Sequence, residues 1–302
     1  MSRQTNQSSD KNYWVKEVND LVRGASGGFL FGIPLLYTME VWAIGSYVTP
    51  PLMLSILGVT YVVVFLFNSV EGFRIEKCDT IADVALESIE AMAIGLVCVT
   101  ILLILLQRIT WETPLNEGLG KVIFESVPFA LGVSIARSLL SDEKTKNTHS
   151  KQKNRGNSHK NHNNRENISN YDETLSDVSA TFVGAIIIGF SLAPTDEVTI
   201  LAVTASPPWL LAIMLVSLLI SYCIVFAAGF TKQNKRQQQR GLFQTPGSET
   251  IFSYLISLLV SVLMLWFFQK LNFSDPWFLW LRLTMLLGLP ATIGGAAGRL
   301  AV

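Results

Sequence analysis

Eight apolar stretches, each about as long as a membrane-spanning helix, constrain this chain more than any other feature of its sequence. A helix that crosses the hydrocarbon core of a bilayer needs about 20 predominantly apolar residues. The stretches cover residues 24–45, 52–71, 84–106, 122–141, 179–203, 207–230, 248–268 and 276–300. Only 15% of the residues are charged, whereas a soluble domain has roughly 25%. The sequence therefore predicts an all-α membrane protein with eight transmembrane helices and the lipid bilayer as its environment.

The basic residues predict the orientation of these helices. If the N-terminus is cytoplasmic, 19 of the 23 Lys and Arg residues fall on the inner side of the membrane. The other four lie at outer positions, and they are Arg108, Lys121, Lys270 and Arg282. Because cytoplasmic loops carry an excess of Lys and Arg, we expect both termini to be cytoplasmic. The formal net charge is zero, which argues against nucleic acid as a partner.

A polar segment divides the apolar stretches into two groups of four. Residues 142–178 are rich in Asn, Lys and Ser, and such a segment has too little apolar area to offset the entropy of the chain. We therefore expect a disordered cytoplasmic linker there, and a cytoplasmic N-terminal segment at residues 1–23. The linker contains all three histidines, His149, His159 and His162. A solvated tether is favoured over a metal site for them, and we expect no metal and no cofactor.

The two groups of helices resemble each other in sequence. A shift of 157 residues, which becomes 162 after a five-residue insertion, superimposes Gly, Pro, Glu and Arg residues of the first group on those of the second. The pairs include Gly27 with Gly184, Glu40 with Glu197, Glu87 with Glu249, Pro128 with Pro290, Gly132 with Gly294, and Arg137 with Arg299. Each group has an even number of helices, so both have the same orientation in the membrane. The sequence predicts two parallel four-helix repeats, at residues 24–141 and 179–302.

Two matched pairs of opposite charges lie near the cytoplasmic ends of the helices. Glu87 and Arg137 are on the third and fourth helices of the first repeat, and Glu249 and Arg299 are their counterparts in the second. A charge at the centre of a bilayer costs about 2.5–3.5 kcal/mol, so such residues usually have a partner or face a water-filled cavity. We expect two ion pairs. They could fix the depth of the helices, or they could form an inner gate.

Glu40 and Glu197 lie in the outer half of the first helix of each repeat, and no basic residue is an evident partner, although Arg282 could reach Glu197. Unpaired carboxylates in a membrane can exchange protons or hold cations. Proline residues precede both glutamates and can free backbone carbonyl oxygens near them. The candidate ion or substrate site therefore consists of Glu40, Glu197, Asp196, Thr38, Pro34 and Pro194. A structural hydrogen bond from a protonated glutamate is the alternative.

Two motifs carry a resemblance to a known family. GIPLLYTMEVW at residues 32–42, together with APTDEV at residues 193–198, resembles a family of bacterial integral membrane proteins of unknown function, found in cyanobacteria and soil proteobacteria. The resemblance implies a multi-pass protein of the bacterial inner membrane. The resemblance supports the choice of Glu40, Asp196 and Glu197 as candidate site residues, but it implies no activity.

Two functions are consistent with these features. The first is a transporter or channel for a cation or a proton-coupled small solute, which would use the paired glutamates. The alternative is a non-transporting protein that binds a partner subunit or lipid through its basic loops, such as residues 232–240. An enzyme is disfavoured because no histidine lies in any apolar stretch and no nucleotide-binding motif is present. Assembly into a homo-oligomer is left open.

Overall fold

The computed structural model describes residues 4–70, 80–140, 162–227 and 246–301, and these residues form helices joined by short turns. The first group of elements is α1 (Gln4–Leu36), α2 (Met39–Ser46), α3 (Pro50–Val70), α4 (Ile81–Leu105) and α5 (Leu115–Leu140). The second is α6 (His162–Leu192), α7 (Glu197–Thr204), α8 (Pro207–Tyr222), the π-helical turn η1 (Cys223–Ala227), α10 (Pro246–Phe267) and α11 (Trp277–Ala301). Within these described residues, seven helices are long and apolar enough to cross a membrane, or eight if the bent pair α1 and α2 counts as one span. The predicted all-α membrane class is confirmed.

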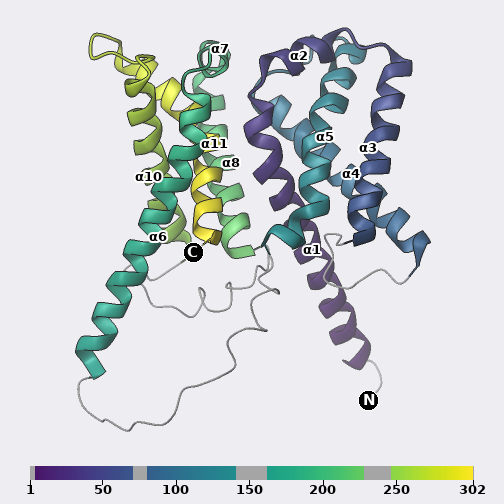
Figure 1. Ribbon diagram of the computed structural model, residues 1–302, viewed down its shortest axis with the longest axis horizontal. Coiled ribbons are helices and arrows are strands. Elements are labelled where there is room, and N and C mark those ends of the chain that lie inside the picture. The colour runs from purple at the N-terminus through teal and green to yellow at the C-terminus, as the bar shows by residue number, and fades with distance from the viewer. Residues whose placement is uncertain (1–3, 71–79, 141–161, 228–245, 302) are drawn as a thin grey trace.

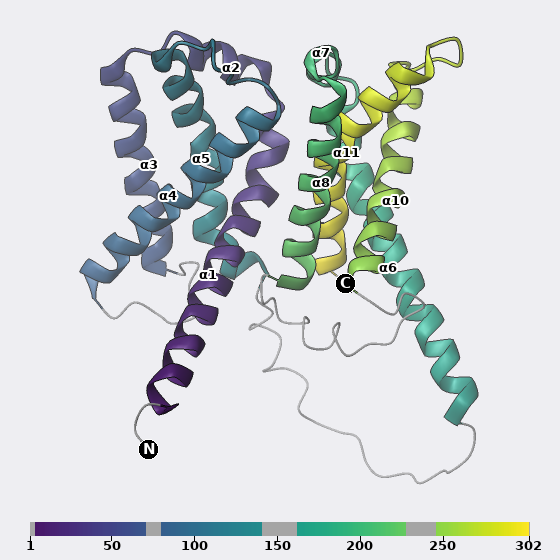
Figure 2. The same ribbon diagram turned by 180° about the vertical axis from the view of Figure 1, so that it is seen from behind.

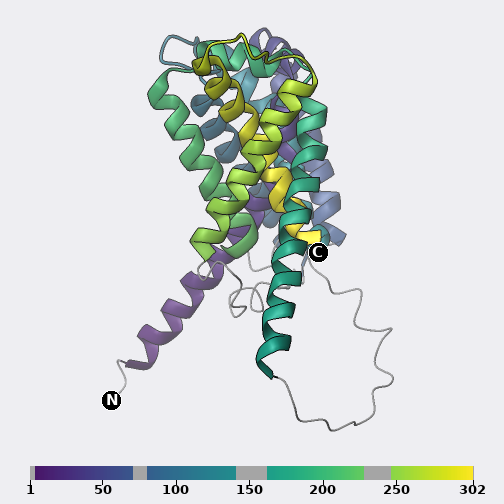
Figure 3. The same ribbon diagram turned by 90° about the vertical axis from the view of Figure 1, so that its left-hand side faces the viewer.

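The helices form two bundles that stand side by side, α1–α5 in one and α6–α11 in the other (Figures 1 and 2). The short helices α2 and α7 lie at the same end of the molecule, which we call the α2/α7 end. Helix α1 begins and helix α11 ends towards the opposite end, where the first turns of α1 and α6 extend beyond the bundles (Figure 3).

The first long helix of each bundle stops short of its predicted end. We expected single helices over residues 24–45 and 179–203, but α1 ends at Leu36 and turns through 89° into α2, and α6 ends at Leu192 before α7 begins. Pro34 lies in the last turn of α1, where its ring removes a helical hydrogen bond. The Trp42 indole N–H donates to the Leu36 carbonyl at 2.8 Å and so satisfies a carbonyl group at the buried end of α1. Pro194 follows α6, and a helix usually ends before the residue that precedes a proline.

Glycines let the helices of each bundle approach closely. Gly27 of α1 lies against Gly132 of α5, so that a Cβ atom on Gly27 would come within 2.5 Å of the Cβ of Ala136. Gly184 of α6 lies against Gly294 of α11, where an added Cβ on Gly294 would lie 2.5 Å from the Gly184 carbonyl oxygen. Close backbone contact through small residues is a common way for helices to associate in lipid.

Helices α4 and α10 end in the same way. Gln107 and Gln269, which coincide at the shift of 162 residues, adopt left-handed conformations with φ of 57° and 58°. The residue after each one donates its backbone N–H back into the helix, from Arg108 to Leu103 at 2.8 Å and from Lys270 to Leu265 at 2.9 Å. The basic side chains of Arg108 and Lys270 therefore start from equivalent points of the two bundles.

The described part of the predicted linker is helical. Helix α6 begins at His162, although we expected disorder over residues 142–178. Apolar residues recur every three or four positions at Ile168, Tyr171, Leu175 and Val178, and this spacing continues the helical pattern of the apolar stretch that follows. Likewise α1 extends back to Gln4, into the predicted N-terminal segment. Residues 142–161 and the basic residues 232–240 lie outside the described parts of the chain.

Candidate functional site

The two glutamates singled out from the sequence begin the two short helices. Glu40 lies in the first turn of α2 and is exposed, and Glu197 lies in the first turn of α7 and is half-buried. Because α1 and α6 end early, both glutamates stand at the α2/α7 end and not along the straight first helices where we had placed them. One carboxylate oxygen of Glu197, Oε2, is buried without a hydrogen-bond partner. The two positions are equivalent in sequence but differ in their surroundings.

Asp196 forms an ion pair with Lys270, which we had expected only as a charge in an outer loop. The Lys270 ammonium lies 2.7 Å from Asp196 Oδ1, and this hydrogen bond and charge hold the pKa of the Asp196 carboxyl below its ordinary value. The suggested pairing of Arg282 with Glu197 is not what the structure shows. Arg282 donates to the Ala202 carbonyl at 3.3 Å and lies 4.1 Å from the centre of the Phe278 ring.

We expect Lys270→Met to affect stability only slightly and only where Asp196 is ionised. Water and salt screen an exposed ion pair, so it contributes little to stability, and the Asp196 side chain is 84% exposed. Because its pKa is lower in the folded protein, the pair stabilises the fold above the ordinary aspartate range, and the contribution is lost as the pH falls through the folded pKa. Thermal unfolding of Lys270→Met and of the unchanged protein should therefore differ slightly at neutral pH and coincide in strong acid. A difference that persisted in acid would contradict this.

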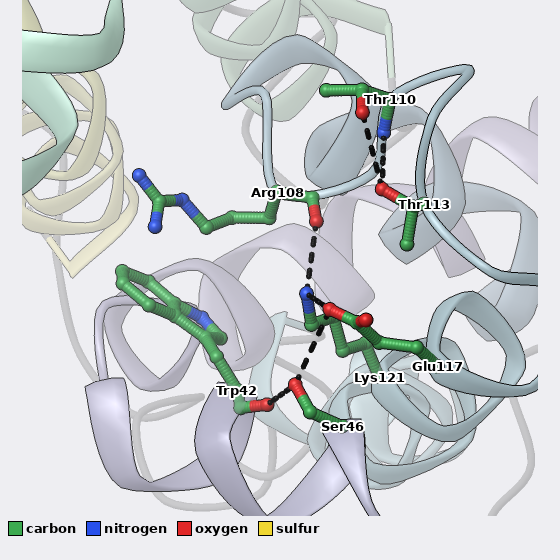
Figure 4. Close-up of polar contacts among 7 residues, drawn as sticks. All are labelled: Trp42, Ser46, Arg108, Thr110, Thr113, Glu117 and Lys121. Carbon is green, nitrogen blue, oxygen red and sulfur yellow. Dashed lines mark hydrogen bonds and ion pairs between the residues drawn. The ribbon is translucent and has the colours of Figure 1, made fainter.

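A second polar cluster lies at the α2/α7 end of the first bundle (Figure 4), and Arg108 links it to the other bundle. The Arg108 guanidinium lies 4.7 Å from the centre of the Trp42 ring in α2, and its Nη2 donates to Thr204 Oγ1 of α7 at 3.2 Å. Burial lowers the pKa of Arg108 from its ordinary value. Lys121 Nζ donates to the Arg108 carbonyl at 3.2 Å and to Glu117 Oε1 at 2.6 Å. The sequence had marked Arg108 and Lys121 only as outer charges.

The other residues of the predicted site are less closely involved. Thr38 precedes α2 in an extended conformation, and its side chain makes no capping hydrogen bond. Pro34 is half-buried, whereas Pro194 is exposed. Neighbouring Tyr37 is buried, and its hydroxyl donates to the Leu286 carbonyl of α11 at 2.8 Å, which joins the two bundles. Among the described residues, no group of three or more His, Cys, Asp or Glu side chains could hold a metal ion.

At the opposite end, the structure brings Glu249 and Arg299 together in an ion pair. Arg299 is buried, its Nη1 donates to Ser253 Oγ at 3.0 Å, and its guanidinium lies 5.5 Å from the centre of the Phe226 ring in η1. Glu87 is also buried. The side chain of Arg137 lies outside the described part of the structure, so the pairing of Glu87 with Arg137 stays a prediction.

One buried carboxylate escaped the sequence analysis. Glu125 lies in the middle of the apolar segment Leu115–Ala136 of α5, is 1% exposed, and has an oxygen atom, Oε1, without a hydrogen-bond partner. It has no acidic counterpart in the second bundle, where Leu287 occupies the matching position. Glu125 is therefore not one of the charges that match between the two halves. The position of a glutamate inside the predicted helix 122–141 was the signal that could have found it.

The comparison with protein families agrees with the assignment to the membrane. A family model described as "Putative integral membrane protein (DUF2391)" matches residues 20–302, which include all the site residues above. A search of the curated proteins and a search of the solved structures found no match. The family match covers most of the chain, and the helices have the length and apolar composition of membrane spans. The chain therefore belongs to the DUF2391 family of integral membrane proteins.

Proposed function

We propose that the protein transports a cation, or a small solute coupled to a proton, across a bacterial inner membrane. It would do so as a carrier or channel without enzymatic activity. The observation that carries the proposal is the matched interruption of α1 and α6, each followed by a short helix that begins at or next to a glutamate. Interrupted helices at corresponding places of two halves are a recognised pointer to a transport site.

The proposal includes the topology expected from the sequence. We infer two parallel four-helix repeats with both termini cytoplasmic, which would put the α2/α7 end on the outer side. Three pairs of matching features support the repeats: the contacts Gly27–Gly132 and Gly184–Gly294, the left-handed residues Gln107 and Gln269, and the short helices α2 and α7. The excess of basic residues in the inner segments supports the orientation.

The glutamates at the α2/α7 end would act as an entrance for the transported ion. A carboxylate attracts cations, and the unpartnered oxygen of Glu197 leaves an acceptor available. Glu40 is exposed and could exchange an ion with the aqueous phase. Lys270 neutralises Asp196 but leaves Glu197 without that partner. The two glutamates would therefore differ in affinity although they coincide in sequence.

Flux into proteoliposomes tests the transport function. We expect the purified protein to move sodium, rubidium or protons, reported by radioactive tracers and by a pH-sensitive dye inside the vesicles. Glu40→Gln and Glu197→Gln should each lower the rate about tenfold, which corresponds to losing about 1.4 kcal/mol of interaction with the ion in the rate-limiting step. Glu112→Gln is the matched control, because Glu112 is an exposed carboxylate in the turn between α4 and α5.

The outcomes separate two parts of the proposal. Unchanged flux in both variants would remove the glutamates from the pathway. The absence of flux of any of the three ions in the unchanged, folded protein would overturn cation transport itself.

A further inference from the structure

Glu125 is a buried carboxylate that is not part of the proposed entrance at Glu40 and Glu197. It lies near the midpoint of the apolar segment Leu115–Ala136, its residue is 1% exposed, and Oε1 has no hydrogen-bond partner. An ionised carboxylate in such a place costs several kcal/mol unless a counter-charge or a hydrogen bond compensates it. Something must therefore neutralise Glu125.

Helix α5 itself supplies one charged neighbour. Glu117, Lys121 and Glu125 are spaced at intervals of four residues, so they follow one another along one face of the helix. Lys121 now lies with Glu117, at 2.6 Å, and with the Arg108 carbonyl at 3.2 Å (Figure 4). The flexible side chain of a lysine one turn away from two carboxylates can reach either of them. Lys121 thus binds a partly exposed carboxylate, Glu117, and lies one helical turn from a buried one, Glu125.

The helices packed against α5 bring no other charge close to Glu125. The charged residues of α1 all precede Gly24, and Gly27 already lies against Gly132, about 10 Å along α5 from Glu125. Gly95 of α4 lies against Ala130, which places Glu87 and Glu90 still farther towards the opposite end. Helix α3 has no charged residue, and Glu40 of α2 is exposed. Asp83 precedes Glu87 in α4 and is therefore farther still from Glu125. The other titratable side chains of these helices are tyrosines and Cys98, which are uncharged at neutral pH.

From this arrangement we infer that Glu125 is a proton-binding site inside the first bundle, and that Lys121 exchanges with the proton as its counter-charge. While Lys121 binds Glu117, Glu125 holds a proton. When Lys121 turns to Glu125, the proton leaves and Glu117 is compensated by water, because the Glu117 side chain is 33% exposed. This exchange of partners takes place on the side of Glu125 that faces the α2/α7 end. This inference concerns proton binding and stands independently of whether the protein transports an ion.

Dicyclohexylcarbodiimide is a suitable probe because it is apolar and reacts with protonated carboxyl groups. The carboxyl O–H adds across one C=N bond of the reagent, and the acyl group then migrates to nitrogen to give a stable N-acylurea. Mass spectrometry locates the adduct. We expect Glu125 to be labelled in detergent-solubilised, monodisperse protein at mildly acidic pH, and the labelling to decline as the pH rises. Glu249 is the internal control, because it forms an ion pair with Arg299.

Two variants should move the labelling profile of Glu125 in opposite directions. Lys121→Met removes the counter-charge, so labelling should persist to a pH at least about one unit higher, the smallest effect of a nearby opposite charge on a carboxylate. Glu117→Gln releases Lys121 to Glu125, so labelling should be lost at a lower pH than in the unchanged protein. Because all three proteins are compared at each pH, the pH dependence of the reagent cancels. A general loosening of the fold would move both profiles in the same direction.

Three results would overturn the inference. The first is the absence of an adduct on Glu125 at every pH in folded protein. The second is a pair of variant profiles that coincide with that of the unchanged protein or shift in the same direction. The third is protection of Glu125 by sodium or potassium at constant pH, which would show that a metal cation and not a proton occupies the site.

Discussion

Gly184→Val should destabilise the second bundle by about 3 kcal/mol, the upper end of the range for overpacked cores. A Cβ atom at this position would meet the carbonyl oxygen of Gly294 and lie 3.1 Å from the Cα of Gly298. Both contacts are with the backbone of α11, which cannot change its rotamer to make room as a side chain can. Helices α6 and α11 must therefore separate, and the packing that closes the bundle is lost. Unfolding in a denaturing detergent, followed by circular dichroism, measures the effect.

Gly58→Val is the matched control for this experiment. Gly58 is exposed in α3, and a Cβ atom there would have no neighbouring atom within 4 Å. The same substitution in a membrane helix should therefore change stability by less than about 0.5 kcal/mol, as for surface positions in general. Equal destabilisation by the two variants would show that valine is harmful in these helices for a reason other than the contact between α6 and α11.

Glu249→Gln should cost about 3 kcal/mol, the lower end of the range for breaking a buried ion pair. The variant leaves the Arg299 charge, on a residue that is 1% exposed, without its carboxylate. The glutamate side chain is 24% exposed, and the screening this allows places the effect at the lower end. The same detergent titration measures the loss.

The double variant Glu249→Leu with Arg299→Met distinguishes a structural ion pair from a gate. Replacing both members of a buried pair by apolar residues is often neutral or stabilising, so most of the lost stability should return. If the pair is only structural, the double variant should also transport at the normal rate. A stable double variant with lost or unregulated flux would instead assign the pair to the transport cycle. Continued instability would contradict the predicted energetics.

The parts of the fold that depend on apolar length were predictable from the sequence. Stretches of about 20 apolar residues predicted the long helices, because the bilayer core demands that length from any span. The ends of the first helices were not predictable in the same way. Apolar residues continue through Pro34 to Trp42, and hydropathy does not register that the Trp42 indole caps Leu36 after a sharp turn. The displacement of Glu40 to the end of its bundle follows from that turn, and the displacement of Glu197 follows from the end of α6 at Leu192, before Pro194.

The ion pair at the end opposite α2 and α7 was predictable because both halves carry the same residues there. Comparing the halves singled out Glu249 and Arg299, which the structure joins. The same comparison passed over Glu125, because Leu287 stands at the matching position. It also did not predict the contacts of Lys270 and Arg108. The directions of these side chains depend on the left-handed conformations of the preceding residues, Gln269 and Gln107. The presence of a glutamine in the sequence does not predict a left-handed backbone conformation, which is uncommon for residues other than glycine and asparagine.

Arg108 makes the two short helices parts of one unit. Its guanidinium lies over Trp42 of α2 and donates to Thr204 of α7. A movement of either helix would therefore displace the Arg108 guanidinium, which also contacts the other helix. An ion that shifts α2 on binding near Glu40 would then change the affinity near Glu197, and thermodynamic linkage requires the reverse effect to be equal. Binding isotherms of the intact protein should accordingly depart from a Hill coefficient of one, and Arg108→Gln should return them to independent sites.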